Sequence, residues 1–382
     1  MKTNRRDWLK FALGSTASLL TVPALAEQLM QAPVSEAERN HKSIVPPGGL
    51  IRLGSNENPY GPSPISRNAI MGSMVEANRY SFEVSSNFKK FLAQKEGVTP
   101  DHILLGNGSS ELLCLAGISL GLERKRVLSP FPVFRLMMDY AEKLGATWDK
   151  VPLTENFQID FPAMEKNIKP DTKMIFVVNP NNPVGTLTDW NAYTQFCENA
   201  SKSCTVYSDE AYLEFLPREQ QRSMVELVKK DCDVLVSRTF SKVYGLAGLR
   251  LGYLIGKPER IKEMAKYQMG ANVNINQAVL AAAQAALDDS QFIESTKRLN
   301  TEARAVLENY LQAKKINYAP SVINLLFFPS PLPGKTMLSK TEEAGFQIRV
   351  WDYAGKEWCR VSIGTKAEMQ DFVRAFDKII GV

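Results

Sequence analysis

Histidine is almost absent from this sequence of 382 residues, and its cysteines are few and form no familiar motif. The two histidines, His41 and His102, and the five cysteines make no CxxC pair or His-rich cluster, so neither a metal site nor a His-based nucleophilic site is predicted. The odd number of cysteines, several of them in apolar segments, favours buried free thiols over a disulfide framework. Blocks of like charge are also missing despite the net charge of +5, which argues against nucleic-acid binding.

Long apolar runs are lacking after residue 26, and the one before it has the features of an export signal. Arg5 and Arg6 precede an apolar run that ends in Ala24-Leu25-Ala26, an A-x-A cleavage pattern. The sequence therefore predicts a twin-arginine signal over residues 1–26 and a periplasmic or secreted protein that meets a membrane only during export. The alternatives are an uncleaved amphipathic start or a lone anchor, although the run is short for a spanning helix, and a cytoplasmic location.

The rest of the chain is ordinary globular material, 44% hydrophobic and 23% charged, with room for one large domain and a smaller one. Residues 27–62 are rich in Pro, Gly and Asn and indicate an extended arm. Helical patterns cover 111–120 and 190–200, and a longer one covers 277–314 before an α+β tail. Short apolar runs between them predict strands buried on both faces, at 103–105, 126–128, 174–178, 205–207 and 234–236. This alternation predicts an α/β fold with a mostly parallel central sheet covered by helices on both sides.

Polar residues follow several of these strands, where open α/β sheets bind their ligands. Lys242, in the Ser/Thr-rich segment after the strand at 234–236, could form an imine with an aldehyde cofactor if burial or nearby positive charge lowers its pKa. The ordinary alternative is a solvated lysine. Asp209, after the strand at 205–207, could pair with a protonated pyridine nitrogen or could simply cap a helix. Tyr212 and Asn182 lie where they could donate to a cofactor oxygen, although the Asn182 segment also has the composition of a plain turn.

Two further segments suggest a site for phosphate. Residues 106–111 form a Gly-Asn-Gly-Ser-Ser-Glu segment that follows a predicted strand and opens a helix. Backbone N–H groups at a helix start, next to small residues, bind phosphate well, but no Walker motif is present. Ser241 and Arg250 could grip the same phosphate, the arginine through a charge-assisted pair.

Taken together, these residues resemble class I/II aminotransferases of fold type I, most closely the histidinol-phosphate aminotransferase group. The resemblance runs from about Leu53 to Thr365 and is strongest in four segments, which are residues 56–62, 181–183, 209–212 and 241–250. It implies pyridoxal 5'-phosphate as the cofactor and division of the chain into an arm with a small-domain contribution at 27–75, a large cofactor-binding domain at 76–288 and a small domain at 289–382.

The resemblance also implies a role for each matching residue. Lys242 would hold the cofactor as a Schiff base and shuttle the α-proton. Those implied to bind the cofactor are Gly108, Ser109, Ser110, Phe131, Asn182, Asp209, Tyr212, Ser241, Arg250 and, from a neighbouring subunit of a homodimer, Tyr80. Those implied to bind the substrate are Tyr60, Arg349 and Arg360. Phe131 could instead be an ordinary core aromatic, and Arg360 a surface arginine on an edge strand.

Three positions depart from the family pattern, and one of them, Trp351, could reshape the distal part of the substrate pocket. Val184 replaces a usual Thr, Ser110 a usual Asp, and Trp351 stands where Pro is common. The predicted reaction transfers an amino group between an amino acid, histidinol-phosphate-like or another α-amino donor, and a 2-oxo acid. A decarboxylase or β-lyase on the same scaffold and a non-catalytic cofactor-binding protein are the alternatives.

Overall fold

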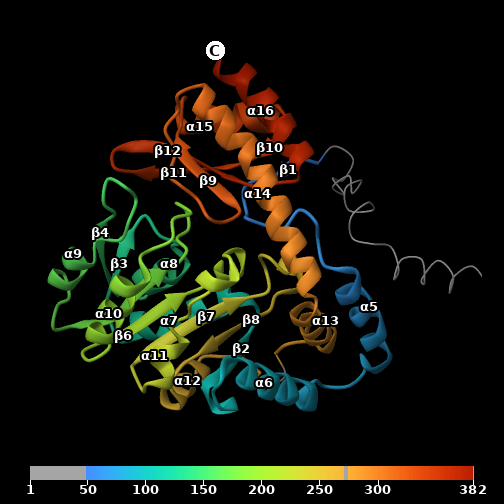
Figure 1. Cartoon of the computed structure of the whole chain (residues 1–382). Coiled ribbons are helices and arrows are strands. Elements are labelled where there is room, and N and C mark those ends of the chain that lie inside the picture. The colour runs from blue at the N-terminus through green and yellow to red at the C-terminus, as the bar shows by residue number, and fades with distance from the viewer. Residues whose placement is uncertain (1–48, 271–273, 382) are drawn as a thin grey trace, which may run out of the picture. The chain divides into compact units, whose positions relative to one another are not determined.

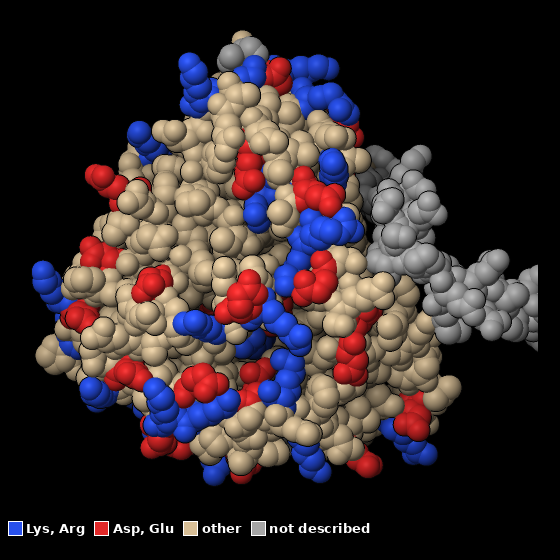
Figure 2. Space-filling view, in the orientation of Figure 1, with Lys and Arg blue, Asp and Glu red and all other residues tan. Residues whose placement is uncertain are grey.

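A computed structural model describes residues 49–270 and 274–381 (Figure 1). The predicted export signal at 1–26 and the first part of the predicted arm lie outside these residues. Within them, no helix is long and apolar enough to cross a membrane. All five cysteines are free, and Cys197, Cys204 and Cys359 are buried. Acidic and basic side chains are interspersed over the face shown in Figure 2.

A seven-stranded sheet carries most of the chain, with strand order β2-β8-β7-β6-β5-β3-β4. Its strands are β2 (Ile103–Gly106), β3 (Arg126–Phe131), β4 (Thr147–Pro152), β5 (Thr172–Val178), β6 (Thr205–Asp209), β7 (Val234–Thr239) and β8 (Gly252–Ile255). β8 runs antiparallel to both of its neighbours, and the other pairings are parallel. The predicted mostly parallel sheet and its five predicted strands are therefore confirmed. The sequence pattern missed β4, in which charged residues alternate with apolar ones, and the short β8.

Helices cover both faces of this sheet (Figure 1). They are α6 (Phe82–Glu96), α7 (Gly108–Leu122), α8 (Leu136–Lys143), α9 (Phe161–Lys166), α10 (Trp190–Ala200), α11 (Val225–Lys229) and α12 (Pro258–Ala265), with α5 (Pro64–Ser73) and α13 (Gln277–Asp288) beside them. Successive strand residues point to opposite faces, so Phe176 and Tyr207 lie in one hydrophobic cluster while Val177 and Val206 lie in another. Burial on both faces explains why these strands are apolar without interruption.

The predicted helical stretch at 277–314 is wrong as a single helix. It is divided into α13 and α14 (Ser290–Ala313) at Asp289, which has non-helical backbone angles of φ −91° and ψ 68°. The Asp289 carboxylate accepts a hydrogen bond from the Phe292 N–H at 3.1 Å and so caps the second helix. The apolar pattern of the sequence continues from α13 into α14. The break between the two helices is therefore visible only in the structure, where the Asp289 side chain caps α14.

A smaller antiparallel sheet near the C-terminus has the order β11-β12-β9. It comprises β9 (Leu325–Pro329), β11 (Arg349–Tyr353) and β12 (Lys356–Ser362), with α15 (Gly334–Glu343) and α16 (Lys366–Ile380) packed nearby. β1 (Ile51–Arg52) pairs in parallel with β10 (Phe346–Gln347). Leu53 belongs to the same hydrophobic cluster as Phe372 and Phe376 of α16. Residues 51–53 therefore lie beside this small sheet, and the residues that follow reach the segment after β7, where the Ser55 carbonyl accepts a hydrogen bond from Lys242.

Candidate active site

The ends of β6 and β7 bring a carboxylate and a hydroxyl together. Asp209 and Ser237 are paired in register, and Ser237 Oγ donates to Asp209 Oδ1 at 2.9 Å. Burial raises the pKa of Asp209 to about 6, although the bond from Ser237 opposes the rise. The alternative of Asp209 as a helix cap is wrong, because the following 3-10 helix (Leu213–Phe215) begins after Tyr212. Asp209 is a buried carboxylate at the carboxyl end of β6.

Lys242 follows the end of β7, which runs to Thr239 and so takes in part of the predicted loop. Its Nζ donates to the Ser55 carbonyl at 3.1 Å and lies 5.7 Å from the centre of the Tyr212 ring. Burial and the Arg360 guanidinium together lower the pKa of Lys242 to about 8, against the opposing charges of Glu57 and Asp209. Lys242 is half-buried rather than fully solvated, and its amine is partly neutral near neutral pH.

A cluster of small polar residues surrounds the start of α7. The N-cap residue of α7, Asn107, makes no side-chain cap, so the N–H groups of the first turn are left without that partner. Arg250 donates to Ser110 Oγ at 3.2 Å and to Ser241 Oγ at 3.4 Å. Gly108 has a φ of +75°, and a Cβ placed there would overlap Arg250 Nη2 and lie 2.9 Å from its Cζ. Gly108 therefore leaves the space in which the guanidinium approaches the start of α7. These groups and Ser109 line a cup that could hold an anion.

A buried arginine reaches the same region from the small sheet. Arg360 is only 5% exposed and lies on the central strand β12, so the alternative of a surface arginine on an edge strand is wrong. Its Nη1 donates to Asn182 Oδ1 at 3.0 Å and its Nη2 to the Gly54 carbonyl, whereas its buried Nε has no partner among the described residues. Burial and, to a smaller extent, the nearby Arg349 lower the pKa of Arg360 to about 10.

Arg349 lies directly opposite Arg360 in the β11–β12 register. Its Nε donates to the same Gly54 carbonyl at 3.3 Å, and the Trp351 ring lies 6.0 Å from the Arg360 guanidinium carbon. Like charges in opposed positions destabilise a sheet unless an acceptor or anion lies between them. The Gly54 carbonyl oxygen, which carries no full charge, accepts hydrogen bonds from both arginines. This end of the site is therefore suited to bind an anionic group.

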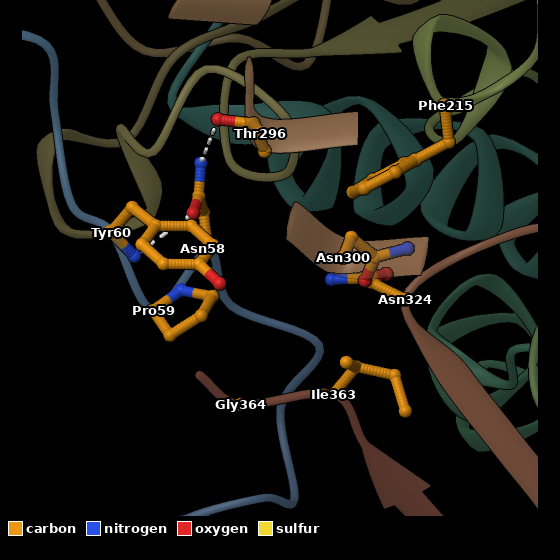
Figure 3. Close-up of a pocket in the computed structure, with 9 residues that line it drawn as sticks. All are labelled: Asn58, Pro59, Tyr60, Phe215, Thr296, Asn300, Asn324, Ile363 and Gly364. Atoms are coloured by element: carbon orange, nitrogen blue, oxygen red, sulfur yellow. Dashed lines mark hydrogen bonds between the residues drawn. The ribbon is translucent and has the colours of Figure 1, made fainter. Parts of the chain in front are cut away.

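The three remaining predicted residues, Phe131, Tyr80 and Tyr60, make no hydrogen bond to Lys242 within the part of the chain that the structure describes. Phe131, at the end of β3, contacts Trp148 edge-on at 5.8 Å between ring centres, so a core role and a role at the cofactor both remain open. Tyr80 is 82% exposed. Tyr60 is buried and lines a small cavity with Asn58, Thr296, Asn300 and Asn324 (Figure 3). Its predicted contact with substrate stays a prediction.

Sequence reasoning missed the part that residues 54–57 play in the site. Consecutive carbonyls of Gly54 and Ser55 accept bonds from Arg360 and Lys242, and the Asn56 amide donates to the Tyr212 hydroxyl at 2.9 Å. Residues 56–62 stood out as a motif, but backbone carbonyls carry no sequence signal. Ser237 was also missed, because only the strand register shows that it faces Asp209.

The chain is similar to known proteins in both sequence and structure. The family model for aminotransferases of class I and II matches residues 49–376. A histidinol-phosphate aminotransferase of Moorella thermoacetica is 31% identical over 96% of both chains, and histidinol-phosphate aminotransferase 2 of Hydrogenovibrio crunogenus is 34% identical over 91% of this chain and 92% of its own.

Two crystal structures extend the similarity to the fold. A protein of Erwinia carotovora atroseptica has a TM-score of 0.81 at 30% identity and covers 86% of this chain and 96% of its own. The histidinol-phosphate aminotransferase of Sinorhizobium meliloti, in complex with pyridoxal 5'-phosphate, has a TM-score of 0.78 at 23% identity and covers 92% and 96%.

Fold and site together define a pyridoxal-phosphate-dependent aminotransferase of fold type I. More particularly, the chain belongs to the aminotransferase class I and II family. The residues present fit that cofactor. The cup at Gly108 offers uncapped N–H groups and a guanidinium to a phosphate, Asp209 offers a buried carboxylate to a ring nitrogen, and Lys242 offers an amine of lowered pKa to an aldehyde.

Proposed function

We propose that this aminotransferase moves an amino group from an anionic amine donor to a 2-oxo acid, with Lys242 as the catalytic base. The observation that carries this proposal is the lowered pKa of Lys242, at about 8, beside the buried arginine Arg360. A lysine that is partly neutral near pH 7 can attack an aldehyde and can accept the proton from the donor Cα. The guanidinium of Arg360 would hold the donor so that this proton faces Lys242 Nζ.

The cofactor would lie across the ends of β5, β6 and β7. Its phosphate would meet Gly108, Ser109, Ser110, Ser241 and Arg250, its ring nitrogen Asp209, its phenolic oxygen Asn182 and Tyr212, and its ring face Phe131. When bound, it supplies the aldehyde and an electron-withdrawing ring. The buried Asp209 carboxylate would keep the ring nitrogen protonated, because a neighbouring negative charge favours the positively charged form of that nitrogen.

Borohydride reduction followed by peptide mapping tests the role of Lys242. We expect a pyridoxyl adduct on Lys242 and none on the exposed Lys150, which serves as an internal control for non-specific labelling. An adduct on another lysine, or no adduct at all, contradicts the proposal.

The donor would carry a second anionic group that reaches Arg349. The opposed pair of Arg349 and Arg360 supports this proposal, and a phosphorylated amine such as histidinol phosphate is the first donor to test, since the curated relatives carry that name. Conversion of bound aldehyde to the amine form, followed by absorbance, ranks the donors. Arg349→Ala should weaken acidic and phosphorylated donors and spare neutral ones, whereas Arg374→Ala, an exposed arginine of α16, should change neither. Equal loss for both kinds of donor counts against this role.

We further propose that two copies of the chain form the working enzyme. An exposed apolar patch supports a second copy, and it consists of Ile65, Met71, Met74, Val75, Tyr80 and Phe82. Tyr80 would reach the cofactor phosphate of the neighbouring subunit. Val75→Asp should shift the mass in solution from dimer to monomer, while Leu122→Asp, an exposed apolar position on α7, should leave it unchanged. Tyr80→Phe should keep the dimer and weaken cofactor binding.

The export signal and the domain division complete the proposal. Residues 1–26 would direct the folded, cofactor-loaded protein out of the cytoplasm, and the chain would divide into the arm at 27–75, the large domain at 76–288 and the small domain at 289–382. Arg5→Lys combined with Arg6→Lys should retain the protein in the cytoplasm, and Arg39→Lys should not. Export of the double variant at the normal rate contradicts a twin-arginine route.

A further inference from the structure

Asn56 is a buried polar residue of the site that lies outside the predicted set. Its side chain is 1% exposed, and each of its polar groups has a partner. Asn56 N–H donates to Ser362 Oγ at 2.8 Å, Ser362 Oγ donates back to Asn56 Oδ1 at 2.7 Å, and Asn324 Nδ2 donates to the Asn56 carbonyl at 3.0 Å. The fourth bond runs from Asn56 Nδ2 to the Tyr212 hydroxyl oxygen at 2.9 Å.

The backbone of Asn56 is held in a conformation that few residues tolerate. Its φ is +53°, in the left-handed region, where asparagine is among the most favourable residues after glycine. Such a conformation costs free energy and persists only where its surroundings fix it. An asparagine here satisfies both the backbone and the four hydrogen bonds, which a glycine could not do.

The hydrogen bonds of Ser362 and Tyr212 show the direction of the amide. Ser362 Oγ accepts the Asn56 N–H and donates its own proton to Asn56 Oδ1. The amide nitrogen faces Tyr212, so the Tyr212 oxygen accepts and its own proton points elsewhere. Burial raises the pKa of Tyr212 to about 12, against the opposing effects of Arg360 and the Asn56 bond and with a further rise from Asp209. Tyr212 therefore keeps its proton in the site.

We propose that Asn56 is a positioning residue that turns the hydroxyl proton of Tyr212 toward the phenolic oxygen of the bound cofactor. The inference rests on the proposed cofactor placement. Ser362 holds the amide in the required orientation, and it lies two residues from Arg360 on β12, on the same face of the strand. The residue that orients Tyr212 is thus fixed by the strand that carries the substrate-binding arginine.

The absorbance titration of the Lys242–cofactor chromophore reads this proton directly. A hydrogen bond to the phenolic oxygen spreads its negative charge, so removal of the bond should make the chromophore hold its proton more strongly. We expect Tyr212→Phe and Asn56→Gly each to raise the apparent pKa of the chromophore by about one unit, with faster release of cofactor. Glycine tolerates the positive φ, so this substitution removes the amide without backbone strain.

A double variant separates positioning from a structural role. If Asn56 acts through Tyr212, Asn56→Gly should shift the chromophore no further once Tyr212→Phe is present. Ser362→Ala should shift it in the same direction as Asn56→Gly. Asn300→Ala, which loses a buried amide bond to the Ile323 carbonyl away from Tyr212, should lower stability without moving the chromophore.

Two results would overturn the inference. An unchanged chromophore in Asn56→Gly, or shifts that add fully in the double variant, would show that the amide does not act through Tyr212. If Asn56→Gly fails to fold, Asn56→Asp replaces it, because aspartate keeps the shape and the positive φ but lacks the donor. Asn56→Asp must then raise the pKa of the chromophore less in the Tyr212→Phe background than in the unaltered protein. Absence of any chromophore on Lys242 in the unaltered enzyme would instead refute the proposed function.

Discussion

Substitution of Gly108 by alanine is the sharpest perturbation of the anion-binding cup. The added Cβ would overlap Arg250 Nη2, so the guanidinium must move away from the start of α7 and from the serines it now contacts. A hydrogen bond from a charged group contributes about 1.5–3 kcal/mol, so the loss of one such bond to the cofactor phosphate should weaken binding by roughly 10- to 150-fold. The positive φ of +75° adds a separate cost of about 1–2 kcal/mol to folding, with and without cofactor.

Titration of the apoprotein with cofactor measures the affinity, and thermal unfolding of the apoprotein measures the strain. Gly355→Ala is the matched control, because Gly355 has a similar φ of +71° and no atom within 4 Å of an added Cβ. It should lower stability without weakening cofactor binding. Pyridoxal, which lacks the phosphate, should bind Gly108→Ala and the unaltered protein equally. Unchanged affinity for the phosphorylated cofactor, or equal losses for both ligands, would refute the assignment of this cup to phosphate.

Three other predictions concern charge. Because the pKa of Lys242 is lowered to about 8, capture of cofactor by the apoprotein should speed up as pH rises and level off above about pH 8. Arg360→Met should move the midpoint of this pH profile upward, because Arg360 lowers the pKa of Lys242. An unmoved midpoint contradicts an electrostatic effect of Arg360 on Lys242. Arg360→Lys should lower kcat/KM by about tenfold or more for carboxylate donors and less for amines without a carboxylate, and the same loss for both would speak against that contact. Arg238→Met should lower the free energy of unfolding by about 3–5 kcal/mol in denaturant titrations, because Arg238 is buried against Glu210 and Glu214 at 3.1 Å and lies near Glu96. The control Arg374→Met, at an exposed position, should change this free energy by less than about 1 kcal/mol.

The sequence by itself determined the fold class and the residues that follow the main strands. Strands buried on both faces must be apolar throughout, so five of the seven stood out, and the reactive side chains had to follow them at the edge where parallel strands end. Asp209, Asn182 and Lys242 were identified in this way, because each is a polar residue in the short segment that follows an apolar run.

Only the tertiary structure decided how those residues act. The pKa of Lys242 depends on burial and on Arg360, which lies 118 positions away along the chain and reaches the site through the pairing of β12 with β11. The carbonyls of Gly54 and Ser55 and the proton direction at Asn56 depend on how residues 54–57 pass between the two sheets. Such effects come from distances between groups that are remote in sequence, and from backbone atoms that every residue possesses, so no local pattern of residue types records them.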